Sequence, residues 1–254
     1  MIRPVSHRHF LRRAAVAAAA AAALVCTACS GSENPGSPFP AVSVPAAASS
    51  AAASSATLDA SKVGDTITET VRNASSVRIS GTQVSGDGSK TKLDLQIGKT
   101  GVTGSIEKDG IKIPLLRVGE KVYFQFTQEL AKASGVPDSA APIVVGKWVP
   151  LDSKAGKSVG DTLRIFLNYD LFMGAMASEL SKGAYTGGEP ADVSGIPALS
   201  YQNSDGKLYL EAAAPHRLLR ADGGKDGSLD FSDWDKPVDA KVPADSEIFT
   251  GAGA

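Results

Sequence analysis

The chain has almost no cysteine and almost no histidine. Its two cysteines, Cys26 and Cys29, lie within the first 29 of 254 residues, so residues 58–250 can form neither a disulfide nor a cysteine-ligated metal site. His216 is the single histidine beyond residue 9. A Ser-His-Asp hydrolase would need it, but a lone histidine without recognisable partners is weak evidence, and we expect it to be exposed or merely hydrogen-bonded. The sequence predicts no catalytic activity, no metal and no cofactor.

The chain also lacks a cluster of basic residues. It has 26 Lys and Arg against 27 Asp and Glu, and removal of residues 1–28 with their four arginines leaves 22 minus 27, a formal charge of −5. A mildly acidic body is a poor partner for nucleic acid and for the surface of anionic lipids. Four aspartates do not have the spacing of a calcium-binding loop, so we interpret them as a solvated strand and turn. These are Asp226, Asp230, Asp233 and Asp235.

A long apolar run occurs at the N-terminus. Four arginines and no acidic residue precede the run Ala14–Val25, and Thr27-Ala28-Cys29 follows it, which is the order of a secretion signal. The run is too short to span a bilayer, which needs about 20 residues. The segment resembles a bacterial lipoprotein signal, in which the cysteine after the cleavage site is acylated. The resemblance implies removal of residues 1–28 and a lipid on Cys29; the alternatives are a plain signal cut near Ala28 and an uncleaved anchor.

The next segment is poor in charged and aromatic residues. From Ser30 to Thr57 the chain consists almost entirely of Ala, Ser, Pro, Gly and Val, with Glu33 as its single charge and Phe39 as its single aromatic residue. Such a composition cannot bury enough apolar surface to fold. We interpret residues 29–57 as the lipidated cysteine and a disordered tether, and residues 58–250 as one domain.

The body combines helices with many short strands. Asp59 can cap a helix over 61–73, in which Val63, Ile67 and Val71 recur on one face. The segments that follow alternate between apolar and polar residues and end at turn signals such as Asp109-Gly110. A short helix is predicted over 127–133. Extended segments are predicted at 77–80, 93–97, 102–107, 111–113, 121–126, 147–151, 183–193, 196–202, 207–213, 217–221 and 228–232.

Residues 162–180 are different in kind. Apolar side chains cover so wide an arc of the predicted helix that we expect it to be surrounded by the rest of the domain, with Asp161 as its cap and Gly174 as a point where it could split. About nine or ten strands around one apolar helix predict an α+β fold, in which a strongly curved antiparallel sheet, a half-barrel, wraps around the helices. The role of Ile143-Val144-Val145 stays open between a strand, a cavity lip and a docking surface.

Several short motifs resemble the LppX/LprG group of actinobacterial lipoproteins, whose fold is similar to that of LolA and LolB. Besides Cys29 and the tether, these are Lys147-Trp148-Val149-Pro150-Leu151, Gly195-Ile196-Pro197-Ala198, Asp205-Gly206-Lys207-Leu208-Tyr209 and Leu229–Pro237. The resemblance covers most of the chain from Leu58 onward. It implies a half-barrel with a hydrophobic cavity between sheet and helices that can hold acyl chains.

Such a cavity has to be large and apolar. Lifting one 16-carbon chain from a bilayer into water costs about 13 kcal/mol, which corresponds to burial of roughly 500 Å² of apolar surface. The side chains that could line the cavity come from the strands and from the apolar helix; the alternative is that they touch one another and fill a dry core. On the strands these are Leu93, Leu95, Ile97, Ile106, Ile113, Val122, Phe124 and Phe126, and on the helix Leu163, Phe166, Leu167, Leu171, Phe172 and Met176.

Three functional hypotheses follow. The first is a monomeric lipoprotein, anchored through Cys29 to the extracytoplasmic face of the cell membrane, that binds lipid or lipoglycan acyl chains and carries or presents them. The second is a structural or signalling lipoprotein with a filled cavity, which acts by contact with an envelope protein partner. The third, an envelope enzyme, has the least support.

Overall fold

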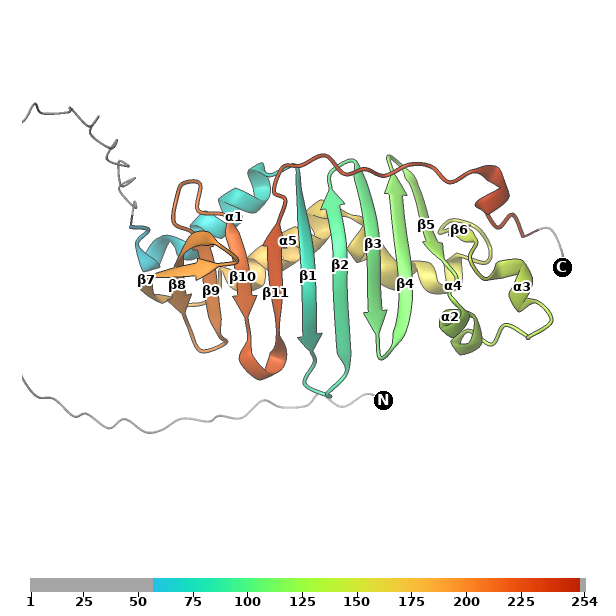
Figure 1. The fold of residues 1–254 in the computed structure, drawn as a ribbon, viewed down its shortest axis with the longest axis horizontal. Coiled ribbons are helices and arrows are strands. Elements are labelled where there is room, and N and C mark those ends of the chain that lie inside the picture. The colour runs from blue at the N-terminus through green and yellow to red at the C-terminus, as the bar shows by residue number, and fades with distance from the viewer. Residues whose placement is uncertain (1–56, 252–254) are drawn as a thin grey trace, which may run out of the picture. The chain divides into compact units, whose positions relative to one another are not determined.

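An antiparallel sheet with helices on one face forms the described part of the chain (Figure 1). The computed structural model describes residues 57–251. The first strands are β1 (Ser76–Val84), β2 (Lys90–Gly98), β3 (Gly101–Lys108), β4 (Ile111–Val118), β5 (Lys121–Gln125) and β6 (Trp148–Pro150). The others are β7 (Thr186–Val193), β8 (Ile196–Gln202), β9 (Lys207–Glu211), β10 (Leu218–Asp222) and β11 (Gly227–Ser232).

The sheet joins two meanders. Its order is β6-β5-β4-β3-β2-β1-β11-β10-β9-β8-β7, so strands adjacent in sequence lie side by side except β6 and β7, which are at opposite edges. The two meanders meet where β1 pairs with β11. Each of the predicted extended segments forms a strand, and the sheet has eleven strands where nine or ten were expected. Leu93, Leu95 and Ile97 alternate with polar residues and are buried on the face that meets the helices. The predicted α+β half-barrel is confirmed.

The helices cover the concave face of the sheet, and Figure 1 shows α4 and α5 behind the strands. They are α1 (Val63–Asn73), α2 (Gln128–Ala133), α3 (Ala141–Val144), α4 (Lys157–Leu163) and α5 (Tyr169–Leu180), with a 3-10 turn, η2 (Arg164–Leu167), between the last two. Before α1, the Ser61 amide donates to the Asp59 carboxylate at 2.8 Å, which caps the first turn as predicted. Val63, Ile67 and Val71 are buried, so the predicted apolar face is confirmed.

The predicted helix over 162–180 is corrected in three respects. It is broken at Asn168, not at Gly174, because the Asn168 side chain accepts from the Leu171 amide at 3.0 Å and caps a new helix. Asp161 lies inside α4 and is not its cap. The apolar helix is also not surrounded, because Leu171 is 59% exposed. Farther upstream, Ile143 and Val144 belong to the short helix α3 and not to a strand.

Two strand glycines sit where a side chain could not. Gly81 in β1 has a φ of +144° and Gly104 in β3 a φ of +132°. A Cβ on either residue would lie 2.1 Å from a carbonyl oxygen of the neighbouring strand, that of Ser228 or of Asp94. Only glycine permits both this φ and this approach, and such positions mark kinks in strongly bent sheets. These glycines are therefore part of what gives the sheet its curvature.

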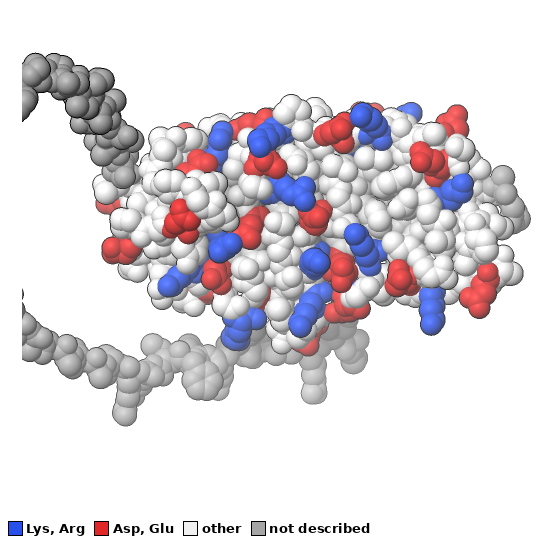
Figure 2. All heavy atoms as spheres, viewed as in Figure 1, with Lys and Arg blue, Asp and Glu red and all other residues white. Residues whose placement is uncertain are grey.

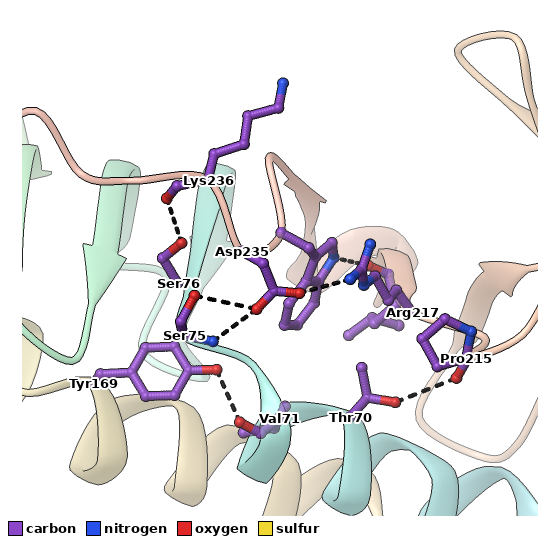
Figure 3. Close-up of polar contacts among 11 residues, drawn as sticks. Thr70, Val71, Ser75, Ser76, Tyr169, Pro215, Arg217, Asp235 and Lys236 are labelled. Carbon is purple, nitrogen blue, oxygen red and sulfur yellow. Dashed lines mark hydrogen bonds and ion pairs between the residues drawn. The ribbon is translucent and has the colours of Figure 1, made fainter.

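The segment that follows β11 crosses the ends of β1, β2, β3, β4 and β5 toward the β6 side of the sheet (Figure 1). At its start, Asp235 accepts from the Ser75 amide at 2.7 Å and pairs with Arg217 at 2.6 Å (Figure 3). At its end, the Phe249 amide donates to the Trp148 carbonyl at 2.8 Å. The C-terminal segment thus ties the starts of β1 and β10, which flank β11 in the middle of the sheet, to β6 at its edge.

Replacement of Asp235 by Asn tests the first of these ties. We expect Asp235→Asn to lower the free energy of unfolding by about 1 to 2 kcal/mol, because it removes the charge from a hydrogen-bonded ion pair that is partly exposed. Asn is chosen because Asp235 has a φ of 62°, which Asn tolerates. Asp239→Asn is the control, since its contact with Lys241 at 3.4 Å is fully on the surface. Urea denaturation measures both, and an equal effect of the two substitutions would contradict the prediction.

Candidate functional site

Most side chains that were predicted to line a cavity are packed against one another. Val122, Phe166 and Met176 are partly buried against the main hydrophobic core of the domain, and Leu171 is exposed. The role of these residues in holding a ligand stays a prediction. The ten that are buried in the main hydrophobic core are Leu93, Leu95, Ile97, Ile106, Ile113, Phe124, Phe126, Leu163, Leu167 and Phe172.

An apolar groove lies at one side of this core. It has a volume of about 510 Å³, within the range of about 300–1,000 Å³ that is usual for ligand pockets. The groove separates η2 and α5 from the ends of β1, β10 and β11. Phe172 and Met176 are the members of the predicted set that line it. The full lining is Gln83, Ile165, Phe172, Ala175, Met176, Ser178, Glu179, Leu180, Ala221 and Leu229.

A polar pocket continues the groove. It has a volume of about 250 Å³ and shares five lining residues with the groove, among them Leu180, Ala221 and Leu229. Besides Tyr185 and Leu208, its other walls come from the mainly polar β8–β9 and β10–β11 turns and the residues beside them, including Asn203, Asp205 and Lys207. The two pockets together form an amphipathic site, with an apolar part beneath α5 and a polar part at the turns.

Tyr185 fixes the chain where the two parts meet. Its hydroxyl donates to the carbonyl of Leu180, the last residue of α5. Burial raises the pKa of the Tyr185 phenol, so the group stays protonated and remains a donor at neutral pH. Because Leu180 lines both pockets, this hydrogen bond holds the end of α5 at the polar side of the groove.

Several groove residues were missed by the sequence analysis. Leu229 and Ala221 face each other across β11 and β10, and Leu229 could have been found from its alternation with polar neighbours. Ile165 and Ala175 carry no such signal, because their position depends on the break at Asn168. Val122, which was predicted to line the cavity, instead borders a separate pocket with Glu120, Lys121 and Arg164.

The chain contains a match to the Gly-x-Ser-x-Gly pattern that the sequence analysis overlooked. It is Gly156–Gly160, and it spans the start of α4 several residues after β6 ends, not the sharp strand-to-helix turn of a hydrolase nucleophile. His216 follows β9, near the other edge of the sheet (Figure 1), and its Nδ1 lies 2.9 Å from the Glu211 carbonyl oxygen. His216 is half-buried and hydrogen-bonded, as expected. The match and the histidine are therefore not assembled into one site.

Residues 57–251 contain neither a candidate metal site nor a candidate membrane-spanning helix. No group of three His, Asp or Glu side chains in this range is placed to hold a metal ion. None of the helices in the same range has the length and apolar character that a membrane crossing requires. Cys29, the predicted site of lipid attachment, lies outside the described residues, as do the predicted signal and nearly all of the tether.

No protein-family model matches the chain. No curated protein matches it either. The chain is similar in structure to LprF from Mycobacterium bovis, with a TM-score of 0.47 and 14% identity over 73% of this chain and 97% of that one. It is also similar to the lipoprotein LppX from Mycobacterium tuberculosis, with a TM-score of 0.41 and 14% identity over 70% and 95%. The MucA/MucB complex of Pseudomonas aeruginosa matches at a TM-score of 0.31 and 14% identity, over 77% and 62%.

These similarities concern the fold. LppX belongs to the group that the sequence motifs resemble, so the predicted resemblance is confirmed at the level of the fold. At 14% identity and TM-scores below 0.5, they support no statement about what this chain binds. The functional argument therefore depends on the groove and on the residues around it.

Proposed function

We propose that the protein is a lipid-anchored lipoprotein of the cell envelope that binds an acyl chain in the groove beneath α5. The observation that carries this proposal is the groove itself, an apolar space of about 510 Å³ at the side of the hydrophobic core. Its apolar walls come from two layers: Phe172 and Met176 on the helix, and Ala221 and Leu229 on the sheet. A thioether such as that of Met176 adapts its shape to different chains.

The amphipathic character of the site indicates what kind of lipid fits. An acyl chain in the groove exchanges one apolar environment for another, which offsets the roughly 0.8 kcal/mol per CH₂ that water would cost. The polar pocket at the β8–β9 and β10–β11 turns then offers hydrogen-bonding groups to the head of the same molecule. Binding needs desolvation and shape alone, with no covalent step.

A second function is favoured by a different observation. Ten of the predicted lining side chains are buried against one another, which is what a filled half-barrel without cargo would show. Such a protein would act as a structural or signalling lipoprotein through contact with an envelope partner. The two functions differ in whether the groove holds a guest.

Lipid content distinguishes them. We expect organic extraction of the purified mature full chain to release non-covalently bound lipid at about one molecule per chain, and native mass spectrometry to show the same mass added to the protein. The acyl groups of the anchor are covalent and stay with the protein. Repeated recovery of lipid-free protein from its own host membranes would favour the structural function.

Substitution of Cys29 tests the anchor. We expect Cys29→Ala to abolish incorporation of labelled fatty acid and to release the protein from the membrane fraction, because the acylated cysteine is the attachment that the sequence predicts. Cys26→Ala is the matched control, since it changes the neighbouring cysteine, which precedes the predicted cleavage site. The lipoprotein assignment would be refuted if the Cys29→Ala protein stayed in the membrane fraction and if neither this protein nor the unaltered one were labelled by fatty acid.

A further inference from the structure

The outward face of α5 is unusual for a helix on the surface of a protein. Asp170 and Glu179 are exposed at its two ends, but the four exposed residues between them carry no charge; we call Leu171, Gly174, Ala175 and Ser178 the outer stripe. All four are exposed, and Leu171 exposes 59% of its surface. A surface helix normally places charged and polar residues there. The outer stripe therefore exposes apolar surface to water without a structural reason within residues 57–251.

The neighbouring helix shows the usual pattern. α1 packs beside α5 on the same face of the sheet. Its outward side carries Asp65, Glu69 and Arg72, all exposed, while Val63, Ile67 and Val71 face the core. The two helices belong to one layer and differ in what they present to the outside. The outer stripe is thus a property of α5 and not of the layer as a whole.

The outer stripe adjoins the groove. Ala175 and Ser178 belong to the stripe and also line the groove, and Ile165, which is 40% exposed, lies on the groove side of α5. Ile165 and Leu171 are the two most exposed apolar residues of the η2–α5 region. Ile165 lies inside the groove and Leu171 outside it, and Ala175 forms the wall between them. Whatever covers the stripe also meets the opening of the groove.

The other face of the sheet is different. Figure 2 shows Lys and Arg interspersed with Asp and Glu over the convex face. Arg78 pairs there with Asp94, and Arg220 pairs with Asp230. A surface of mixed charge is well solvated and does not insert into a bilayer. The outer stripe of α5, which carries no charge, is the part of the body that contrasts most with this surface.

We propose that the outer stripe of α5 docks on the surface of the lipid bilayer, so that the groove opens against the membrane. This proposal rests on the proposed function, because the anchor at Cys29 brings the body to the membrane. Residues 30–56 span at most about 95 Å when fully extended, at about 3.5 Å per residue, while eleven strands side by side cover about 50 Å. The connection to the anchor is long enough for any face to reach the bilayer, and the uncharged stripe selects the helical one. An acyl chain then passes between bilayer and groove without crossing water.

A single fluorophore at position 171 tests the docking. Residues 57–251 contain no cysteine, so the lipidated full chain with Leu171→Cys can be labelled at one site with an environment-sensitive dye such as NBD. Leu171 lines none of the pockets described above, so the dye does not report on lipid inside the groove. Ser105→Cys on β3 is the control, because Ser105 lies directly opposite Asp94 of β2 and shares with it the convex face, where Asp94 pairs with Arg78. Both proteins are reconstituted into vesicles of phosphatidylethanolamine and phosphatidylglycerol that contain a fraction of brominated phosphatidylcholine.

We expect a blue shift and quenching by the brominated lipid at position 171, and neither at position 105. Absence of quenching at both positions, or quenching at position 105 alone, would overturn the docking proposal. A blue shift at position 171 without quenching would also overturn it, because the stripe would then be covered by protein, either a second copy or residues 30–56. Lipid extraction from the same preparation separates the two proposals: bound lipid without quenching leaves the acyl-binding function standing, and quenching without bound lipid leaves the docking standing.

Discussion

Substitution of Gly104 by alanine is expected to lower the free energy of unfolding by about 4 kcal/mol, a large part of the 5 to 15 kcal/mol that is typical of a domain. Two effects combine. A φ of +132° is unfavourable for any residue with a side chain, and the new Cβ would lie 2.1 Å from the Asp94 carbonyl oxygen. Since Asp94 lies in the adjacent strand β2, relief of the clash requires β2 and β3 to move apart in the middle of the sheet. The melting temperature should fall by roughly 10 °C.

Gly110 is the matched control. It also has a positive φ, of +85°, but it lies in the β3–β4 turn, where a Cβ would meet nothing within 4 Å. Gly110→Ala therefore retains the backbone strain and lacks the clash, and we expect it to cost about 1 kcal/mol. Denaturant unfolding of the two variants measures both effects. Equal losses would show that the close approach of β2 and β3 contributes nothing to stability.

Local sequence patterns were sufficient to predict the strands of this fold and the helices α1, α2 and α5, but not α3 or most of α4. Asp109-Gly110 marked the β3–β4 hairpin, and the spacing of Val63, Ile67 and Val71 marked the buried face of α1. The apolar residues of residues 162–180 were also identified, but their division into α4, η2 and α5 was not. Asn168 caps α5, although the three residues directly before it are apolar. Hydrophobic periodicity does not detect a cap in such a position, because the apolar pattern continues through it.

The site was harder to predict than the fold. Apolar side chains on strands and helix mark the interface between the two layers, but composition does not tell whether that interface is closed or leaves a gap. Along most of α5 it is closed, as Met173 at 0% exposure shows. At Ala175 and Ala221 the small side chains leave space between the layers. Sequence analysis selected large residues as lining, and two of them, Phe172 and Met176, do border the groove, but it did not select the small residues Ala175 and Ala221.

Filling the groove gives the second large effect. We expect Ala175→Trp to remove nearly all non-covalently bound lipid from the purified full chain. Ala175 is exposed on α5 and borders the groove, so an indole at this position can enter the space opposite Ala221 and Leu229 without displacing a buried side chain. Trp costs well under 1 kcal/mol of helix propensity relative to Ala, so the fold should be retained. Lipid extraction quantifies the loss, and far-UV circular dichroism checks the fold.

Ala133→Trp is the control for this substitution, because Ala133 is equally exposed on a helix, α2, and borders neither the groove nor its polar extension. It should leave the lipid content unchanged. Met176→Leu adds a conservative test: it keeps the apolar wall and the approximate volume of the groove, so binding should persist. If Ala175→Trp bound as much lipid as the unaltered chain while folding normally, the acyl chain would occupy a space other than this groove, since an indole and an alkyl chain cannot share it.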